Sequence, residues 1–576
     1  MPESILSIIL FLPLISGFII LLLKRNSTII WLSTVTSAVT TLMSGLLVLK
    51  FNANEPGFQF VHWIPNWIVS GKLSIDYMIG LDGLGLLLFF LTSFLFFLSS
   101  LTTWKNITFR IKEFHFCLLL LEFAVLGIFS ALNTVLFYVF WELMVIPMAL
   151  MIGVWGGDKR ILAAVKYLIF SMAGSLLMLA GILILYFKTG TTSIESLSLI
   201  FSDQYSPELR IFVFISFALA FSIKIPVFPL HTWMPDVHTE APTVGSVDLA
   251  GVLLKLGIFG FVRFLIPFFP EISLESREIF AILATIGILW GAFSAMAQED
   301  IKRIIAYSSL SHLGFTLLGL MSFTEMGVAG AMLQLISHGI STGMLFILIG
   351  IFHDRTSTRL LSKVGGAANF MPVFSVFFVI AMLSSVGLPG TNGFVGEFLI
   401  LMGTLKYNVI LGTIAATGVI WTSVYLLWLT KKFIFGTSMD LEGRKVKDLE
   451  FREFIILIPL VIAIFGIGLF PKYFLKILEP SVNTYLNSAS IRMIEERKQT
   501  LTSPNFDYKS LSVTPMSYED RMGKFKSGFE IPLLEKVNRV FPIDPDSETD
   551  TIFQQYDIEK LDETQQEIDL MNGENP

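Results

Sequence analysis

Six ionisable residues lie singly within or beside apolar stretches of this 576-residue sequence, and together they could move protons. They are carboxylates, lysines and histidines: Glu142, Lys224, Lys255, His312, His338 and Glu397. A charged group at the centre of a bilayer costs about 2.5–3.5 kcal/mol on insertion scales, so each must be neutral, paired or hydrated. Histidine exchanges protons near neutral pH, and a buried lysine beside a carboxylate can switch its protonation. The set therefore predicts a proton path.

The two lysines belong to one unusual stretch, Phe221 to Phe264, which is apolar but carries several charges and four prolines. Proline lacks an amide donor and clashes with the preceding helical turn, so this stretch cannot form two plain helices. The freed backbone groups need partners in protein or in cavity water when they lie at membrane depth. A broken helix with buried charges is typical of an ion or substrate path.

Structural explanations compete with the chemical one. A Glu142–Lys224 pair could simply tie two helices together, and a lone membrane histidine is often only a helix contact. Glu122 is expected to be buried near Cys117, without a clear role. Snorkelling near membrane ends accounts for Asp82, Arg263, Lys302 and Arg303. Sodium would require a cluster of carbonyls and carboxylates, and no such cluster stands out, so protons fit the set best.

The composition indicates a helical membrane protein with many spans. Hydrophobic residues make up 54% and charged residues 15%, against about 25% charged in soluble chains. The mean hydropathy is +0.72. A single cysteine, Cys117, excludes a disulfide framework, an Fe–S cluster and a Cys-x-x-Cys metal site. Nucleotide-binding motifs do not occur either, so we expect no cofactor and no metal in this chain.

Apolar windows of about twenty residues predict an all-α fold with about fourteen spans. Loops on one side carry nineteen Lys and Arg residues and loops on the other side carry seven. The positive-inside rule then places both termini on the periplasmic or intermembrane side of a bacterial plasma membrane or a mitochondrial inner membrane. The predicted spans are 4–23, 29–50, 82–103, 114–131, 134–153, 164–187, 209–230, 242–267, 279–297, 303–322, 325–352, 372–400, 408–432 and 453–477.

A second interruption, SSVGLPGTNGFVGEF at Ser384–Phe398, matches the first one at IKIPVFP. If spans 4–8 and 9–13 are two five-helix units, the broken helices 7 and 12 occupy the same position in each. Units with an odd number of spans insert with opposite topology, so the repeat would be inverted, with the transport path at its interface.

The predicted divisions of the chain follow from this repeat. They are residues 1–113 for spans 1–3, 114–270 and 271–435 for the two repeats, 436–480 for the last span, and 481–576 for a tail. Residues 492–576 contain ten basic and eighteen acidic residues, so we expect a polar, acidic and largely disordered tail.

Several of these segments resemble the antiporter-like membrane subunits of respiratory complex I. The likeness rests on IKIPVFPLHTWMPDVHTEAPTVGSVDLAGVLLKLGIFGFVRF, QEDIKRIIAYSSLSHLGF and GLPGTNGFVGEF, and WELMVIPMALMIGVWGG favours the subunit M type, called chain 4 in organelles. It extends over roughly residues 1–480. The resemblance implies a proton-translocating subunit of NADH:quinone oxidoreductase. NADH, FMN, Fe–S clusters and quinone would then be bound by partner subunits, and the main partners would be the two other antiporter-like subunits.

The resemblance also implies a role for each buried residue. Glu142 would be the fifth-helix carboxylate paired with Lys224 of the broken seventh helix. Lys255 would be the central lysine of the eighth helix. His312 and His338 would continue a hydrated axis toward Glu397, the end group on the twelfth helix. Subunits L and N usually carry a lysine at that last position, and the long lateral helix of subunit L is not expected here.

Two alternatives remain open. A subunit of a multisubunit Na⁺/H⁺ antiporter shares the broken-helix motifs, although such relatives tend to carry a lysine in the helix of Glu397. The chain could also be a membrane anchor whose buried charges have no part in proton transfer.

Overall fold

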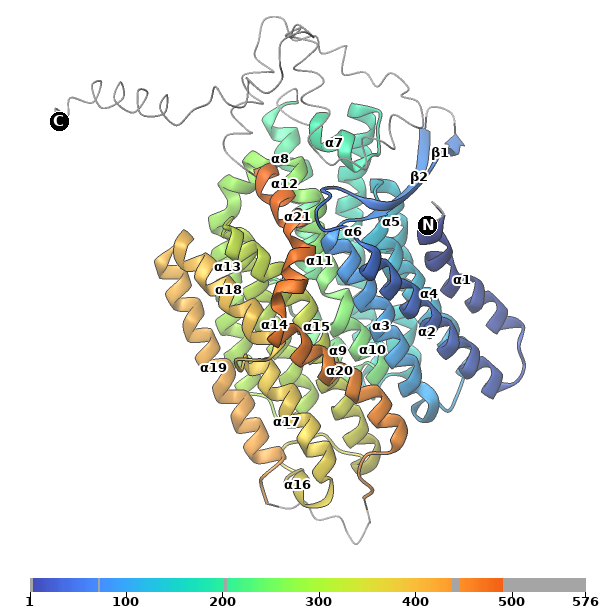
Figure 1. Cartoon of the computed structure of the whole chain (residues 1–576), viewed down its shortest axis with the longest axis vertical. Coiled ribbons are helices and arrows are strands. Elements are labelled where there is room, and N and C mark those ends of the chain that lie inside the picture. The colour runs from blue at the N-terminus through green and yellow to red at the C-terminus, as the bar shows by residue number, and fades with distance from the viewer. Residues whose placement is uncertain (1–3, 71–72, 201–204, 438–445, 490–576) are drawn as a thin grey trace, which may run out of the picture.

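The computed structural model describes residues 4–70, 73–200, 205–437 and 446–489, which form a bundle of long helices with one β-hairpin (Figure 1). Twelve helical segments of this described part are long and apolar enough to cross a membrane. The prediction of a helical protein with many spans is therefore confirmed. The first helices are α1 (Ile5–Leu22), α2 (Asn26–Lys50), α3 (Gly83–Asn106), α4 (Ile111–Ser130), α5 (Thr134–Trp155) and α6 (Arg160–Thr189).

The later helices are long elements separated by several short ones. The central group is α7 (Ile194–Ile200), α8 (Pro207–Lys224), α9 (Trp233–Glu240), α10 (Thr243–Asp248), α11 (Lys255–Gly260), α12 (Ile266–Phe268), α13 (Pro270–Met296), α14 (Ile301–Met321) and α15 (Glu325–Thr356). The last group is α16 (Ala367–Phe370), α17 (Pro372–Val386), α18 (Asn392–Tyr407), α19 (Val409–Phe433), α20 (Phe451–Leu469) and α21 (Pro471–Ala489).

Three helical segments form the interior of the bundle. The buried share of the most apolar window is 100% in α15 and 94% in both α14 and Thr243–Phe268, but only 39% in α1, α2, α6 and α19. A helix that is apolar on every side is stable only when other helices surround it or when it faces lipid. Lys255, His312 and His338 therefore lie on the three most enclosed segments, and all three side chains are buried.

Both predicted helix interruptions are present. Helix α8 ends at Lys224 and the chain becomes helical again at Trp233 in α9. Helix α17 ends at Val386, after which Gly387 and Gly390 adopt φ of +82° and +93° before α18 begins. These φ values favour glycine because a side chain would clash with the backbone.

The predicted eighth span is less regular than a single helix. It consists of α10, α11 and α12 with two π-helical turns between them, η1 (Leu249–Leu253) and η2 (Phe261–Leu265). A Cβ atom on Gly257 would lie 2.6 Å from the carbonyl oxygen of Phe221, so only glycine lets α11 approach α8 this closely. Such π-turns are rare and occur often at functional sites.

A β-hairpin between α2 and α3, which we did not predict, pairs β1 (Gln59–Ser70) with β2 (Leu73–Leu81) in antiparallel fashion. Its register shifts between Ile64 and Ile68, and the shift interrupts the alternation of apolar and polar residues by which a strand is recognised. The Ser7 hydroxyl of α1 lies 2.8 Å from the hydroxyl of Tyr77, which ties the hairpin to the bundle.

The last helices of the described chain differ from the predicted last span. The last predicted span, 453–477, is two helices, because α20 ends at Leu469 and Pro471 opens α21. Proline suits the first turn of a helix but cannot continue one. Helix α21 also passes through the predicted division between residues 480 and 481, and it packs on α3, α12, α13 and α15. The rest of the predicted tail, residues 490–576, lies outside the described residues.

The docking of α21 on α3 depends on a glycine. A Cβ atom on Gly83 would lie 1.9 Å from the carbonyl oxygen of Ile477. We expect Gly83→Val to displace α21 and to destabilise the protein by about 1–3 kcal/mol, the usual range for overpacking. Faster hydrogen exchange over 471–489 would report it. As a control, Gly466→Ala adds a Cβ with no heavy atom within 4 Å and should leave exchange unchanged. Unaltered exchange in Gly83→Val would contradict the prediction.

Candidate functional site: a row of buried ionisable residues

Four of the six predicted residues are linked in one continuous row. The Lys255 ammonium group donates to the carbonyl oxygen of Ala250 and lies 2.8 Å from Nδ1 of His338. The rings of His338 and His312 are 5.5 Å apart between centroids. His312 Nδ1 lies 2.6 Å from Oε1 of Glu397. The row therefore joins α11, α15, α14 and α18, four elements that are far apart in the sequence.

The carboxyl end of this row has an additional partner. Nε2 of Gln334 donates to the same Oε1 of Glu397 at 3.0 Å. Glu397 and His312 expose only 6% and 4% of their side chains, so the contact is shielded from bulk water. Nε2 of both His312 and His338 has no protein partner among the described residues. These two nitrogen atoms therefore have unused hydrogen-bonding capacity beside the row.

Lys224 lies at the other end of the set and is almost fully buried, at the last turn of α8 before the break. Its ammonium group is 3.3 Å from the hydroxyl oxygen of Tyr167 and lies 5.1 Å and 5.8 Å from the ring centroids of Tyr167 and Trp141. No ion pair joins Lys224 to Glu142 among the described residues, so the direct pair that the resemblance implied is not present. The charge of Glu142 still acts on Lys224, and Oε1 of Glu142 has no hydrogen-bond partner in the described part of the chain.

Apolar side chains lie between α8 and α11, the elements that carry the two lysines. A Cβ on Gly257, two residues after Lys255, would lie 2.5 Å from Cγ1 of Ile225, and Gly260 faces the Phe221 ring in the same way. Phe221 and Ile225 flank Lys224, so the first lysine is not linked to the second by any hydrogen bond in the described residues. The site is therefore two segments, Glu142–Lys224 and Lys255–Glu397.

His238 was not among the predicted site residues, although it lies in the broken stretch. Its ring is fully buried in α9 and stacks on Phe346 with 5.2 Å between ring centroids. Neither ring nitrogen has a hydrogen-bond partner among the described residues, while the charges of Lys302 and Lys255 both act on it. His238 lies between prolines in the sequence, which is typical of an exposed loop. Its burial was therefore not predicted.

Two basic residues that we assigned to snorkelling, and Asp82, the acid bound to one of them, are buried and bonded to protein groups. Lys302 is 6% exposed, and its ammonium group donates to the carbonyl oxygen of Ala241 at 2.5 Å. Arg263 is 8% exposed and forms an ion pair with Asp82, which also caps α3 and accepts from the Ser481 hydroxyl of α21. Snorkelling requires a charged head in water, so it does not explain either residue.

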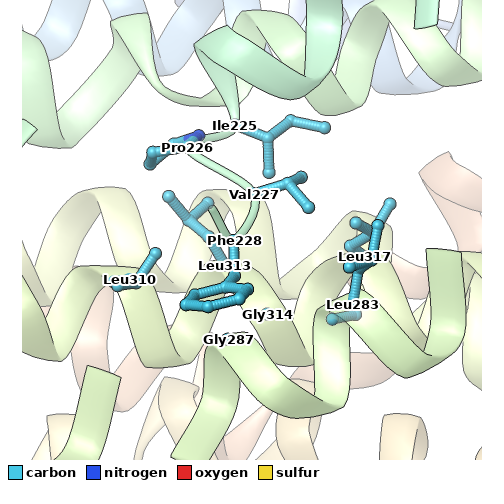
Figure 2. Close-up of a pocket in the computed structure, with 11 residues that line it drawn as sticks. Ile225, Pro226, Val227, Phe228, Leu283, Gly287, Leu310, Leu313, Gly314 and Leu317 are labelled. Atoms are coloured by element: carbon cyan, nitrogen blue, oxygen red, sulfur yellow. The ribbon is translucent and has the colours of Figure 1, made fainter. Parts of the chain in front are cut away.

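An apolar cavity adjoins the break between α8 and α9 (Figure 2). Residues 225–228 at the break line one part, and leucine, alanine and glycine residues of α13 and α14 line the rest. Figure 2 shows the Phe228 ring directed toward Leu313 and Gly287. No ionisable side chain lines this cavity, so it offers space beside the break but no site for a polar solute.

Comparisons with known proteins show which family this chain resembles. A sequence profile of the family described as "NADH:quinone oxidoreductase/Mrp antiporter, TM" matches residues 131–422. The chain is 39% identical over 487 residues to NADH-quinone oxidoreductase subunit M of Rickettsia prowazekii, covering 84% of this chain and 98% of that protein.

Solved structures give the same grouping. A chain of respiratory complex I from Thermus thermophilus with bound NADH is 32% identical, with a TM-score of 0.76 over 84% of this chain and 100% of that one. A chain of the Mrp complex from a Dietzia species has a TM-score of 0.73, again over 84% of this chain and over 99% of its own length. Because that chain is only 19% identical, the second likeness shows a shared fold and nothing finer.

Proposed function

Because this chain belongs to the family of NADH-quinone oxidoreductase subunit M, a membrane subunit of respiratory complex I, we propose that its buried ionisable residues form the proton channel of that subunit. The main observation in support of a proton channel is the row Lys255–His338–His312–Glu397 inside the most enclosed helices. A salt bridge that only fixes helices would need one cation and one anion, not two histidines between them.

The geometry supports a stepwise proton transfer along the row. An ammonium proton of Lys255 points at Nδ1 of His338, within reach of transfer. The free Nε2 atoms of the two histidines can exchange the proton through water, since their rings are 5.5 Å apart between centroids. His312 Nδ1 then delivers a proton to the Glu397 carboxylate at 2.6 Å. The first and last steps join heavy atoms 2.8 Å and 2.6 Å apart, whereas the middle step requires water between the two rings.

The Glu142–Lys224 segment would control when the row accepts a proton. Two unit charges 4 Å apart interact by about 4 kcal/mol at an effective dielectric of 20, which is enough to change the protonation of a neighbour. The apolar contact of Ile225 with Gly257 separates Lys224 from the row. A change of charge at Glu142 would therefore act on Lys255 through the electric field and through small movements at the broken helix.

We also propose the finer architecture predicted from the sequence. Counting α8–α9 and α17–α18 as one crossing each, with the twelve single segments, gives fourteen spans. Spans 4–8 and 9–13 would be two inverted repeats, with residues 114–270 and 271–435 as their limits and α21 closing the membrane domain. Both termini would lie on the periplasmic or intermembrane side, as the distribution of basic loop residues suggests.

The redox chemistry would take place in other subunits. A single cysteine in the sequence cannot hold an Fe–S cluster. NADH, FMN, Fe–S clusters and quinone would be bound by partner subunits, and the two other antiporter-like subunits would be neighbours of this chain in the bilayer. A role in Na⁺/H⁺ exchange is less well supported, because the subunit M relative is twice as similar in sequence as the Mrp chain.

The replacement of either Glu142 or Lys224 by alanine tests the function. We expect both variants to assemble but to lower proton translocation per NADH oxidised, measured in proteoliposomes of the whole complex. Because this segment controls the entry of protons into the row, we expect either loss to approach the effect of losing a proton-transfer group, about 10²–10⁴-fold in rate. Lys50→Ala, a change at an exposed residue of α2, should behave like the wild type. Normal coupled activity in both variants would favour the membrane-anchor alternative.

A further inference from the structure

A second pair of buried acids, Glu122 on α4 and Asp248 at the end of α10, lies outside the proposed channel. Neither side chain has any solvent exposure. The Ser37 hydroxyl of α2 donates to Oε2 of Glu122, and the Ser99 hydroxyl of α3 donates to Oδ1 of Asp248, both at 2.7 Å. Each carboxyl thus accepts one hydrogen bond from a neutral group, and no lysine or arginine of the described residues pairs with it.

The remaining atoms of the pair are unsatisfied. Oε1 of Glu122 and Oδ2 of Asp248 have no hydrogen-bond partner among the described residues, and the charge of Asp248 acts on Glu122. The Ser33 hydroxyl, one turn before Ser37 on the same face of α2, is also buried and unpartnered in the described structure. Two buried carboxylates without a cation would each cost about 2.5–3.5 kcal/mol or more. The pair must therefore hold at least one proton.

A π-helical turn connects this pair to the central lysine. Asp248 directly precedes η1, and the ammonium group of Lys255 donates to the carbonyl oxygen of Ala250 within η1. Leu95, one turn before Ser99 on α3, would lie 2.5 Å from a Cβ on Gly251 of the same turn. Any rearrangement of η1 would therefore move Asp248 and the partner of Lys255 together.

We propose that Glu122 and Asp248 form a second proton-binding site, which takes up and releases one proton as Lys255 changes its own protonation. The step forms one O–H bond on a carboxylate oxygen and breaks one O–H bond of a hydrated proton, and release of the proton reverses it. The site goes beyond the proposed channel and rests on it only for its coupling to Lys255. Other buried titratable groups on nearby elements form no hydrogen bond or ion pair with either carboxyl among the described residues. They are His115, Cys117, Glu142, His238, Lys255 and His338.

Infrared pH-difference spectra of the whole complex in proteoliposomes test the proposal, read in the carbonyl-stretch region of protonated carboxyl groups. We expect Glu122→Gln and Asp248→Asn each to remove a band of the wild type. We expect the other acid in each variant to keep its own band. Spectra of both variants that superimpose on the wild type would overturn the proposal.

Further variants keep the test decisive if either acid is needed for assembly. Ser37→Ala and Ser99→Ala keep both carboxyls but remove one hydrogen bond from each, so we expect each to shift one band. Unshifted bands in both would also contradict the proposal. Ser44→Ala is the matched control on α2, because that hydroxyl donates only to the carbonyl oxygen of Thr40. A Lys255→Met complex that no longer translocates protons should keep both bands but shift the pH at which they change, because the site responds to the charge of this lysine. Retained bands separate failure of the channel from failure of this site, and bands that change at the wild-type pH would contradict the coupling to Lys255.

Discussion

Replacing Lys255 with methionine is expected to lower proton translocation by about 10²–10⁴-fold, the usual contribution of a proton-transfer group, while the complex still assembles. Methionine fills a similar volume but carries no proton, so the row would begin at His338 without a donor. The change also leaves Nδ1 of His338 without its lysine partner, at a cost of about 1–3 kcal/mol. Proton uptake by proteoliposomes per NADH oxidised measures the effect.

A second variant separates proton transfer from charge at this position. Lys255→Arg keeps the positive charge, but a guanidinium group does not release its proton in proteins. We expect this variant to translocate protons as poorly as Lys255→Met. If Lys255 served only as a fixed charge in the helix packing, arginine would restore activity. Wild-type translocation in Lys255→Arg would therefore contradict its role as a proton carrier.

The sequence was sufficient to predict the burial of the site because charge inside an apolar run has few explanations. His312, His338 and Glu397 stand out as isolated polar residues, and the structure brings them together with Lys255. The sequence could not supply the distances between helices that are remote in the chain. The Glu142–Lys224 pair shows this limit, because Tyr167 rather than the carboxylate is the hydrogen-bond partner of Lys224.

The neighbouring residues in the sequence led to a wrong prediction where contacts between distant segments determine the environment of a side chain. Lys302 and Arg263 stand near the ends of apolar runs, where water is the usual partner, yet each finds a buried acceptor on another segment. The helix interruptions, in contrast, were predictable since proline and glycine act on their own backbone. The π-turns beside Lys255 carry no such signal, because η1 contains ordinary helix-forming residues apart from Gly251.

The second large effect is expected at Glu397, where the row ends. Glu397→Gln keeps the volume of the side chain and can still accept hydrogen bonds from His312 and Gln334, but it cannot take up a proton. We expect an assembled complex whose proton release is lowered about 10²–10⁴-fold, as for a missing acid–base group. Release can be followed with a pH-sensitive dye on the output side of proteoliposomes.

Charge reversal at the same position is expected to act more strongly. In Glu397→Lys an ammonium group would face the His312 ring, and two unit positive charges at 4 Å repel by about 4 kcal/mol at an effective dielectric of 20. That repulsion would disfavour protonation of His312. Proton transfer from His338 to His312 would then be impeded as well. Glu397→Asp, which keeps an acid on a shorter side chain, should retain part of the release. If Glu397→Gln released protons at the wild-type rate, Glu397 would be only a hydrogen-bonding partner of His312, and the proton would have to leave the row at one of the histidines.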